Sequence, residues 1–284
     1  MKKYTISDFN KQFPNDDACL EWLRNYLYPD GIPCKSCGKI TGHSKLSNLP
    51  VYSCNRCGSH THPMSGTIFA GSRTPLKQWF YAMFLISATR CGISAKQLQR
   101  ELGVTYKTAW RMFHEIRSLM QSSPEPICGE IEIDETYIGG RKRGGKGGRS
   151  WTENKTPVLG ILQREGVVSA RTIKNIKSKT ILPIIREKVL SFSMIYTDEF
   201  VSYNKLKEHH YIHHKVNHAI KEWARDGIHT NTIEGFWSTL KRGLSGVYHC
   251  VSRKYLQTYI DEYTFRYNHR LDEQPIFLTI LEKV

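Results

Sequence analysis

The chain has 284 residues, which is longer than one average domain and sufficient to bury a substantial core. Lysine and arginine outnumber aspartate and glutamate by 41 to 26, and the net charge of +15 favours nucleic acid or an anionic membrane as partner. The membrane is the weaker alternative, because no apolar run approaches the roughly 20 residues of a spanning helix. No apolar signal segment follows the N-terminus, so we expect a cytoplasmic, reducing location.

Residues 1–30 have the pattern of a short helical lead-in. Asn15 and Asp16 are both residue types that cap helix N-termini, and leucines follow them at helical spacing. Residues 31–72 are rich in Cys, Gly, Ser and His and contain only short strand-like pieces. In a reducing location these cysteines are better interpreted as thiols or metal ligands than as disulfides.

Two Cys-x-x-Cys pairs lie within this second segment, with 16 residues between them. Two such knuckles can present four thiolates tetrahedrally to one Zn²⁺, and a glycine after each permits the tight turn. A site closed by four sulfurs is structural, so it indicates a fold and not a reaction. The alternative is a chance pairing of buried or free thiols. The predicted zinc ligands are Cys34, Cys37, Cys54 and Cys57.

Helical spacing dominates residues 73–122, a basic part of the chain. A hydrophobic helix, a second helix ending at Leu102, a turn at Gly103 and a third helix from Thr105 match the helix-turn-helix layout. The exposed start of the third helix would then reach base edges and phosphates. The alternative is a three-helix packing unit with a solvated basic face. The predicted DNA contacts are Tyr106, Lys107, Thr108 and Arg111.

Beyond Cys128 the pattern changes to strands mixed with helices. Strands first, then a mixture that ends in helices, is typical of an α/β domain with a mixed sheet. The expected strands cover residues 131–133, 158–162, 167–173 and 194–197. The expected helices cover residues 178–190, 230–244 and 253–266.

Three carboxylates fall at the ends of these elements. Asp134 follows the first strand, Asp198 ends the last one, and Glu234 lies in the first turns of a helix. Carboxylates placed in this way can converge on hard cations that take oxygen ligands. Two such cations, about 3.5–4 Å apart, would activate a nucleophile and stabilise the leaving oxygen in phosphoryl transfer. Taken singly, each carboxylate could equally be a solvated surface residue.

Other acidic residues and a group of histidines are alternative metal ligands. Glu132 shares the strand face of Asp134 and is its rival, whereas Glu135 and Glu199 should point to the opposite face from the aspartates that precede them. A histidine cluster lacks ordered spacing to a fourth metal ligand, so we interpret it as a surface feature. It comprises His209, His210, His213 and His214.

A basic, glycine-rich segment follows the expected strand that precedes Asp134. It could be a solvated hairpin tip, but on a DNA-binding protein a cationic loop is a natural backbone clamp favoured by counterion release. Its predicted DNA-binding residues are Arg141, Lys142, Arg143, Lys146 and Arg149.

The spacing of the acidic residues adds a family resemblance. Asp198 and Glu234 have 35 residues between them, and Lys241 follows Glu234 by seven, two helical turns along one face. With the segments IEIDETYIGG, YTDEFVSY and HTNTIEGFWSTLKR, the chain resembles the DDE transposases and retroviral integrases. It is most similar to the small bacterial insertion-sequence transposases with an N-terminal zinc ribbon, the ISXO-like type.

This resemblance implies a transposase that binds the ends of an insertion element, nicks DNA and joins the 3′ ends to target DNA. It implies that Asp134, Asp198 and Glu234 bind two Mg²⁺ or Mn²⁺ ions, and that Lys241 and Arg242 contact DNA near the active site. Some relatives have Asn as the third ligand, so Asn231 is the alternative to Glu234. Double-stranded DNA would be the partner, with a homo-oligomer assembled on it, in the bacterial nucleoid.

The expected fold is α/β, a ribonuclease-H-like mixed-sheet catalytic domain preceded by a zinc ribbon and a helix-turn-helix module. The expected boundaries are 1–30 for the lead-in, 31–72 for the ribbon, 73–122 for the helical module and 128–284 for the catalytic domain. Two other functions fit the same pattern: a DNA-binding regulator with a decayed acidic site, and a ribonuclease-H-like nuclease without strand transfer.

Overall fold

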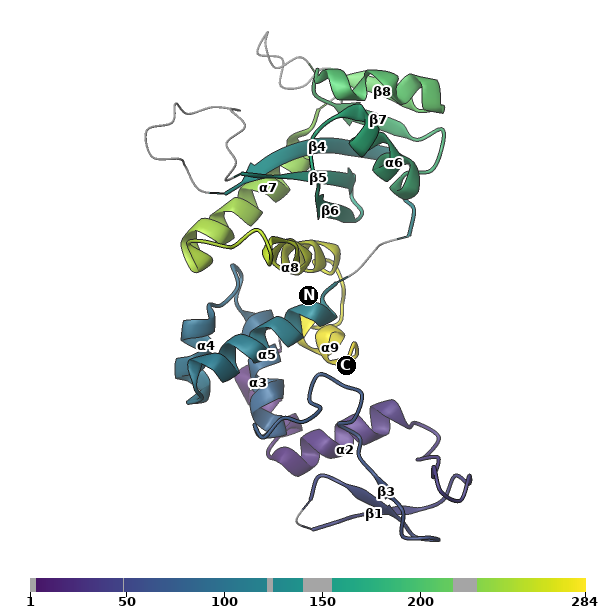
Figure 1. The fold of residues 1–284 in the computed structure, drawn as a ribbon, viewed down its shortest axis with the longest axis vertical. Coiled ribbons are helices and arrows are strands. Elements are labelled where there is room, and N and C mark those ends of the chain that lie inside the picture. The colour runs from purple at the N-terminus through teal and green to yellow at the C-terminus, as the bar shows by residue number, and fades with distance from the viewer. Residues whose placement is uncertain (1–3, 48, 122–124, 140–154, 217–228) are drawn as a thin grey trace. The chain divides into compact units, whose positions relative to one another are not determined.

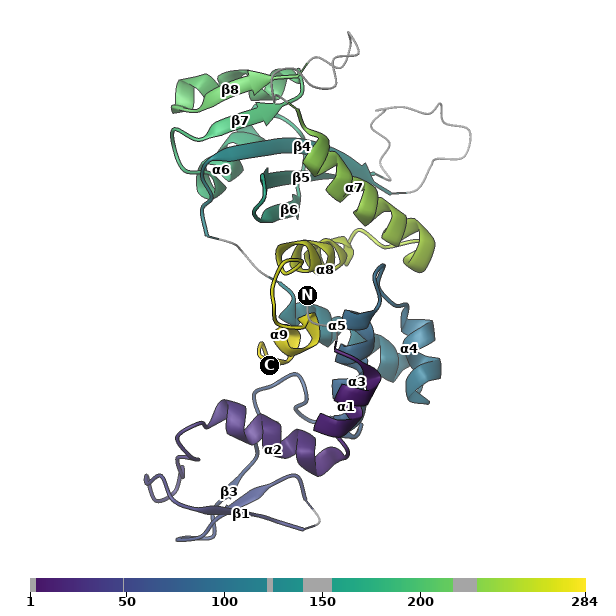
Figure 2. The ribbon, with the colours of Figure 1, turned by 180° about the vertical axis from the view of Figure 1, so that it is seen from behind.

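The computed structural model describes residues 4–47, 49–121, 125–139, 155–216 and 229–284 (Figures 1 and 2). The chain divides into two compact units. Unit 1 comprises Met1–Leu119 together with Asp272–Val284, and unit 2 comprises Met120–Leu271. Within the described ranges, no helix is both long and apolar enough to cross a membrane.

Unit 1 begins with two short helices and a small sheet. Helix α1 (Ile6–Gln12) is followed by α2 (Asp16–Leu27), whose N-cap is Asn15, one of the two predicted capping residues. The Asn15 side chain accepts a hydrogen bond from the Ala18 amide at 2.9 Å, which satisfies one of the free donors of the first turn. Three strands then form an antiparallel sheet: β1 (His43–Lys45), β2 (Tyr52–Cys54) and β3 (His60–Thr61).

The helical part of unit 1 has the predicted order of elements. A strongly apolar helix, α3 (Leu76–Ala88), precedes α4 (Ala95–Leu102) and α5 (Tyr106–Leu119). Gly103 ends α4 in the left-handed conformation with a φ of 65°, so the chain turns at the expected residue before α5 begins.

The last helix, α9 (Ile276–Leu281), belongs to unit 1, although we expected the C-terminal domain to run to residue 284. The reason is aromatic packing. Phe277 is 2% exposed, and its ring centroid lies 5.8 Å from that of Phe9 in α1 and 6.0 Å from that of Phe84 in α3. The end of the chain therefore returns to complete the core of unit 1.

Unit 2 is built on one five-stranded sheet in the order β6-β5-β4-β7-β8. The strand pairs β4–β5 and β5–β6 are antiparallel, whereas β4–β7 and β7–β8 are parallel. The predicted mixed α/β fold is confirmed, and the sheet is consistent with a ribonuclease-H-like domain. The strands are β4 (Glu130–Ile138), β5 (Thr156–Gln163), β6 (Val168–Thr172), β7 (Met194–Thr197) and β8 (Ile212–Lys215).

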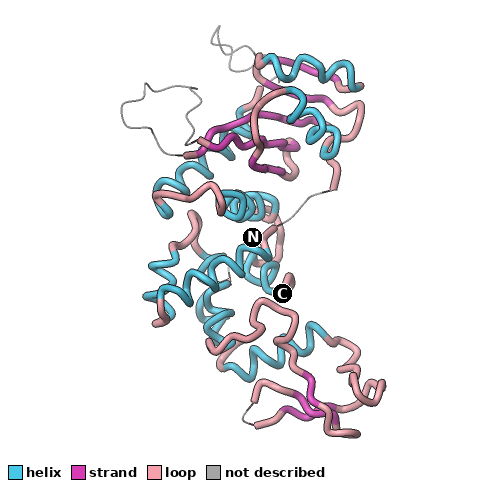
Figure 3. The backbone as a smooth tube through the Cα atoms, in the orientation of Figure 1, coloured by secondary structure: helices cyan, strands magenta, loops and turns pink. Residues whose placement is uncertain are grey.

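Helices cover both faces of this sheet (Figure 3). Helix α6 (Ser178–Lys188) and the 3₁₀ helix η1 (Val201–His209) pack on one face, where they bury Ile131 and Ile133 of β4. On the other face lie α7 (Asn231–Gly243), the π-helical turn η3 (Leu244–Tyr248) and α8 (Leu256–Asn268). Residues that alternate along β4 therefore face two different layers.

Strand β8 was not expected from the sequence, and it corrects one interpretation. The histidine cluster was interpreted as a surface feature, but His213 is only 7% exposed. It lies on β8 opposite Ile195 of β7, and its Nε2 is 2.8 Å from the hydroxyl of Thr197. The interpretation was wrong for His213 because strand pairing turns that one ring inward.

Candidate active site

The four predicted zinc ligands form one cluster in unit 1. The sulfur atoms of Cys34, Cys37, Cys54 and Cys57 all lie within 4.8 Å of one another. In each knuckle the glycine amide donates to the carbonyl of the first cysteine, which closes a tight turn. The Thr41 hydroxyl, 3.0 Å from the Cys54 sulfur, and two backbone amides lower the pKa of Cys54 to about 6. This arrangement fits a tetrahedral Zn²⁺ bound by thiolates.

A second site is an open, polar pocket in unit 2, here named the acidic pocket. Its lining includes four carboxylates and one lysine, drawn from three elements. Asp134 and Glu135 come from β4, Asp198 follows β7, and Glu234 and Lys241 come from α7. Segments far apart in the sequence thus bring together the three predicted acidic residues and the predicted lysine. Within the described ranges, however, the cysteine cluster is the one group of three or more Cys, His, Asp or Glu side chains whose ligand atoms lie close enough together to hold a metal ion.

Asp134 is held in place by a tryptophan from the covering helix. The indole Nε1 of Trp237 donates to Asp134 Oδ2 at 3.0 Å. The ring lies directly over Gly160 of β5, where an added Cβ would come within 2.4 Å of it, so only glycine permits this approach. Burial, together with the charges of Glu135, Asp198 and Glu234, raises the pKa of Asp134 to about 7. A cation in the pocket would relieve this repulsion.

Asp198 is the most enclosed of the predicted acids, at 7% exposure. Its Oδ1 accepts the Phe200 amide at 3.0 Å, which orients the carboxylate at the end of β7. The preceding Thr197 donates its hydroxyl proton to the Asp198 carbonyl at 2.7 Å. Backbone and side chain are therefore both fixed at this position.

Glu234 lies in the first turn of α7 and is exposed. The Thr230 hydroxyl donates to Glu234 Oε1 at 3.3 Å, and the helix dipole favours an acid at this end. Lys241 and Arg242 are exposed in the last turn of the same helix. The pocket lining includes Glu234 and not Asn231, which is also exposed.

Glu135 is a pocket residue that was not among the metal ligands predicted from the sequence. As expected, it points to the opposite face of β4, where Tyr203 of η1 donates to Glu135 Oε2 at 2.6 Å. It nevertheless lines the acidic pocket beside Asp134. Burial and the Glu135 charge raise the pKa of Tyr203 well above its ordinary value, so this phenol remains a donor. The only sequence signal was its adjacency to Asp134.

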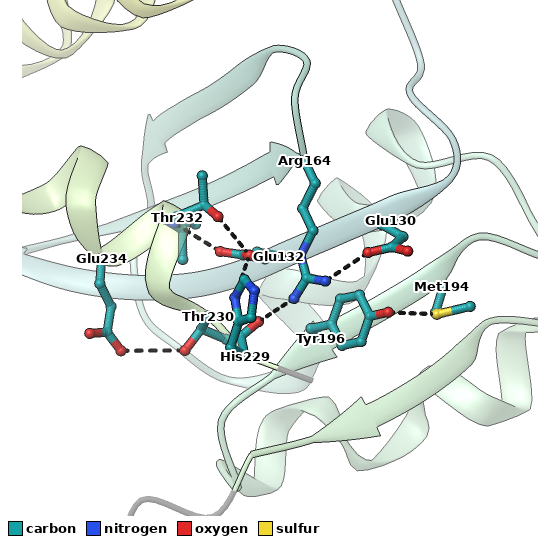
Figure 4. A network of polar contacts seen from close by, with 10 residues as sticks. Glu130, Glu132, Arg164, Met194, Tyr196, His229, Thr230, Thr232 and Glu234 are labelled. Atoms are coloured by element: carbon teal, nitrogen blue, oxygen red, sulfur yellow. Dashed lines mark hydrogen bonds and ion pairs between the residues drawn. The ribbon is translucent and has the colours of Figure 1, made fainter. Parts of the chain in front are cut away.

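Glu132, the rival of Asp134, does not line the acidic pocket. It is fully buried and forms an ion pair with Arg164, with 2.9 Å between Arg164 Nε and Glu132 Oε1 (Figure 4).

The predicted DNA-contacting residues of α5 lie at its start. Tyr106, Lys107 and Arg111 are exposed, and Thr108 is partly buried. Arg111 is anchored within unit 1, because its Nη2 donates to the Ser72 hydroxyl at 3.1 Å. The predicted basic segment, with Arg141, Lys142, Arg143, Lys146 and Arg149, lies outside the described residues.

Comparison with known proteins identifies relatives of both units of the chain. Residues 14–60 match the transposase zinc-ribbon domain. A protein in transposable element ISH50 of Halobacterium salinarum is 25% identical over 90% of this chain and 92% of that protein. A transposase-like protein of Haemophilus influenzae is 35% identical over 34% of this chain and 77% of that protein.

Among solved structures, a chain of the simian T-cell lymphotropic virus intasome in complex with PP2A regulatory subunit B56 gamma matches with a TM-score of 0.32. That match has 14% identity and covers 68% of this chain and 76% of the other. Residues 126–268, which include the sheet of unit 2, match the ISXO2-like transposase domain. The protein therefore belongs to the ISXO2-like transposase family and carries a transposase zinc ribbon at its N-terminus.

Proposed function

We propose that this transposase nicks DNA at the ends of an insertion element and joins the freed 3′ ends to target DNA, and that the acidic pocket is where both steps occur. The observation that carries the proposal is the composition of that pocket. Asp134, Asp198 and Glu234 reach it from three separate parts of the fold, and Lys241 of α7 also lines it. This is the residue set that metal-assisted phosphoryl transfer requires.

Asp134, Asp198 and Glu234 would hold two Mg²⁺ or Mn²⁺ ions, with carboxylate oxygens as the hard ligands that these cations prefer. Bound divalent cations supply charge neutralisation at the scissile phosphate and Lewis-acid activation of the attacking hydroxyl. Lys241 and Arg242 would hold the DNA backbone by charge, and they need not contact the metals.

The chemistry would proceed as two displacements at phosphorus, a hydrolysis followed by a transesterification. In the first, water attacks phosphorus, and the bond between phosphorus and the 3′ oxygen breaks. A 3′-hydroxyl is released. In the second, this 3′-hydroxyl attacks a target phosphodiester and displaces the target's own 3′ oxygen. Each displacement forms one phosphorus–oxygen bond and breaks one, so the protein contributes positioning and electrostatics and no covalent intermediate.

The other parts of the chain would deliver DNA to the pocket. We propose that residues 31–72 bind one structural Zn²⁺, and that residues 73–122 bind element ends through Tyr106, Lys107, Thr108 and Arg111. The basic segment over 141–149 would clamp the DNA backbone. The two ends of the element must be held in one complex, so this function implies a dimer or larger assembly on DNA.

The test uses the full chain and a labelled duplex that carries an end of the insertion element. Incubation with Mg²⁺ should give a nick with a 3′-hydroxyl and then joined products, and EDTA should abolish both. Specific binding without any nicking in Mg²⁺ or Mn²⁺ would favour the regulator. Nicking without joined products would favour the nuclease.

A further inference from the structure

Glu132 is a charged group that the proposed chemistry does not use. Its side chain is 0% exposed near the start of β4, two residues before Asp134. Both of its oxygens accept hydrogen bonds (Figure 4). Oε1 accepts from Arg164 Nε and from the Thr232 hydroxyl, each at 2.9 Å, and Oε2 accepts the Ile233 amide at 2.9 Å. This carboxylate is therefore committed to protein donors.

These contacts attach β4 to the start of α7. The Ile233 amide is one of the first-turn donors that a helix cannot satisfy by itself, and Glu132 satisfies it. A buried negative charge at this end also complements the helix dipole. Glu234 is the next residue along α7. The bonds from Thr232 and Ile233 thus fix the turn that carries the proposed third ligand.

Arg164 extends the same network to β7. It follows β5, its side chain is 16% exposed, and its guanidinium lies 4.0 Å from the ring centroid of Tyr196. Tyr196 pairs with Glu132 across the β4–β7 ladder and precedes Asp198 by two residues. Arg164 Nη1 also donates to Glu130 at 2.7 Å, and Nη2 donates to the His229 carbonyl at 2.8 Å. One guanidinium therefore contacts β4, β7 and the residue that leads into α7.

Stability alone does not explain such a pair. Replacing a buried ion pair by apolar residues of similar volume is often neutral or stabilising, because desolvation offsets the attraction. What this pair provides instead is a fixed geometry, since it joins the three elements that carry Asp134, Asp198 and Glu234. Mg²⁺ demands near-ideal octahedral geometry, so small displacements of its ligands weaken binding.

We infer that Glu132 and Arg164 are positioning residues that set the separation of the three carboxylates, and that Glu132 is not itself a metal ligand; this inference rests on the metal-dependent reaction proposed above. Residues that orient metal ligands in this way typically change metal affinity or activity by about 10- to 100-fold when they are altered.

The test uses the zinc-loaded full chain and the variants Thr232→Val and Arg164→Lys. Thr232→Val removes one donor to Glu132 with little change of shape. Arg164→Lys keeps the charge but loses the forked contacts and the stacking on Tyr196. The readouts are Mn²⁺ binding without DNA, measured by electron paramagnetic resonance, and the Mg²⁺ midpoint of nicking. Both variants should bind Mn²⁺ about tenfold more weakly and need correspondingly more Mg²⁺.

The matched control is Thr258→Val in α8. Thr258 is also half-buried and donates at 2.8 Å, but to the Tyr255 carbonyl, outside this network. It should keep the wild-type Mn²⁺ affinity and Mg²⁺ midpoint. Circular dichroism and thermal melting show whether each variant retains the sheet. Thr232→Val is the mildest change and decides the matter if Arg164→Lys fails to fold.

Two results would overturn the inference. In one, Thr232→Val is folded and has the wild-type Mn²⁺ affinity and Mg²⁺ midpoint. In the other, Glu132→Gln abolishes Mn²⁺ binding while both positioning variants behave as wild type, which would make Glu132 a direct ligand. A wild-type chain that neither binds Mn²⁺ nor nicks DNA fails at an earlier step, and it would overturn the proposed function itself.

Discussion

The zinc-ribbon cluster and the acidic pocket are assembled in opposite ways. The four cysteines come from two tight turns of one small module, and their sulfur atoms already lie within 4.8 Å of one another. The carboxylates come from β4, from the end of β7 and from α7, and they line one open pocket. A structural zinc site can be closed because nothing must enter it, whereas a catalytic site must leave room for substrate.

This comparison predicts two kinds of failure. Loss of a sulfur ligand should cost folding, since the free energy of metal binding is part of the folding free energy of such a module. Loss of a carboxylate at the open pocket should cost chemistry and leave the fold intact. The experiments that follow test this difference, beginning with the largest expected effect.

Glu234→Gln should abolish nicking and strand transfer, by several orders of magnitude. The amide keeps the size of the side chain but removes the charge that would hold a divalent cation. Glu234 is exposed, so stability should change by no more than about 0.5 kcal/mol, and DNA binding should stay near normal. Rates on a labelled element end, with thermal melting alongside, measure both.

Two variants on the same helix serve as comparisons for Glu234→Gln. Asn231→Ala should be milder, because its neutral amide lies outside the pocket lining. Lys241→Ala should fall between them and affect DNA placement more than the Mg²⁺ or Mn²⁺ midpoint. An active Glu234→Gln beside an inactive Asn231→Ala would reverse this order and move the third ligand one helical turn.

Cys54→Ser should unfold the N-terminal part of the chain and spare the C-terminal sheet. Elemental analysis of the wild type should give close to one equivalent of zinc, and the variant should hold less. The variant should lose the cooperative unfolding transition of its N-terminal part. Cys250→Ser, which changes an exposed cysteine outside the cluster, is the control. Full zinc retention by Cys54→Ser would contradict the ligand assignment.

DNA binding should weaken steeply with salt. The basic segment and Arg111 should contribute differently to binding of random DNA and of element ends. Neutralising Arg141, Lys142 and Arg143 together should reduce the slope of log K against log salt by about 2.7, at about 0.9 for each phosphate contact. Arg111→Ala should instead reduce the preference for element ends over random DNA, by about 1–3 kcal/mol. Titrations on both DNAs at several salt concentrations separate the effects. Equal losses of affinity for element ends and for random DNA in both variants would contradict the separate roles of Arg111 and the basic segment.

The last prediction concerns pH and His213 in unit 2. Burial, and then the charges of Lys215, Lys207 and His214, lower the pKa of His213 from 6.5 to about 4. Between these values the unfolded chain binds a proton that the folded chain does not, so stability falls as pH drops from 6.5 toward 4.

The slope due to His213 should approach, at most, about 1.4 kcal/mol per pH unit. His213→Gln should flatten the pH dependence over this window, and urea unfolding at pH 7, 5.5 and 4.5 measures it. Parallel curves for the two proteins would show that His213 contributes nothing to the acid sensitivity.

Much of the architecture was predictable because it depends on local sequence patterns. The Asn15 cap, the turn at Gly103 and the strand over Met194–Thr197 each depend on a few neighbouring residues, and the structure has all three. The cysteine cluster is local in the same sense, since its spacing alone limits how the sulfurs can meet. Mixed strands and helices of this order also led to the correct fold class.

Other features were decided only by tertiary structure. The alternation of β4 placed Glu132 and Asp134 on one face. It could not show that Glu132 would form an ion pair with Arg164 while Asp134 lines the acidic pocket. The burial of His213 depends on the pairing of β8 with β7. The position of α9 depends on the packing of Phe277 against Phe9, which is far away in the sequence. Sequence patterns report which face a residue takes, whereas the partner on that face comes from distant segments. That is why the sequence determined the module order and the candidate ligands, and the packing of the sheet determined which carboxylates share the acidic pocket.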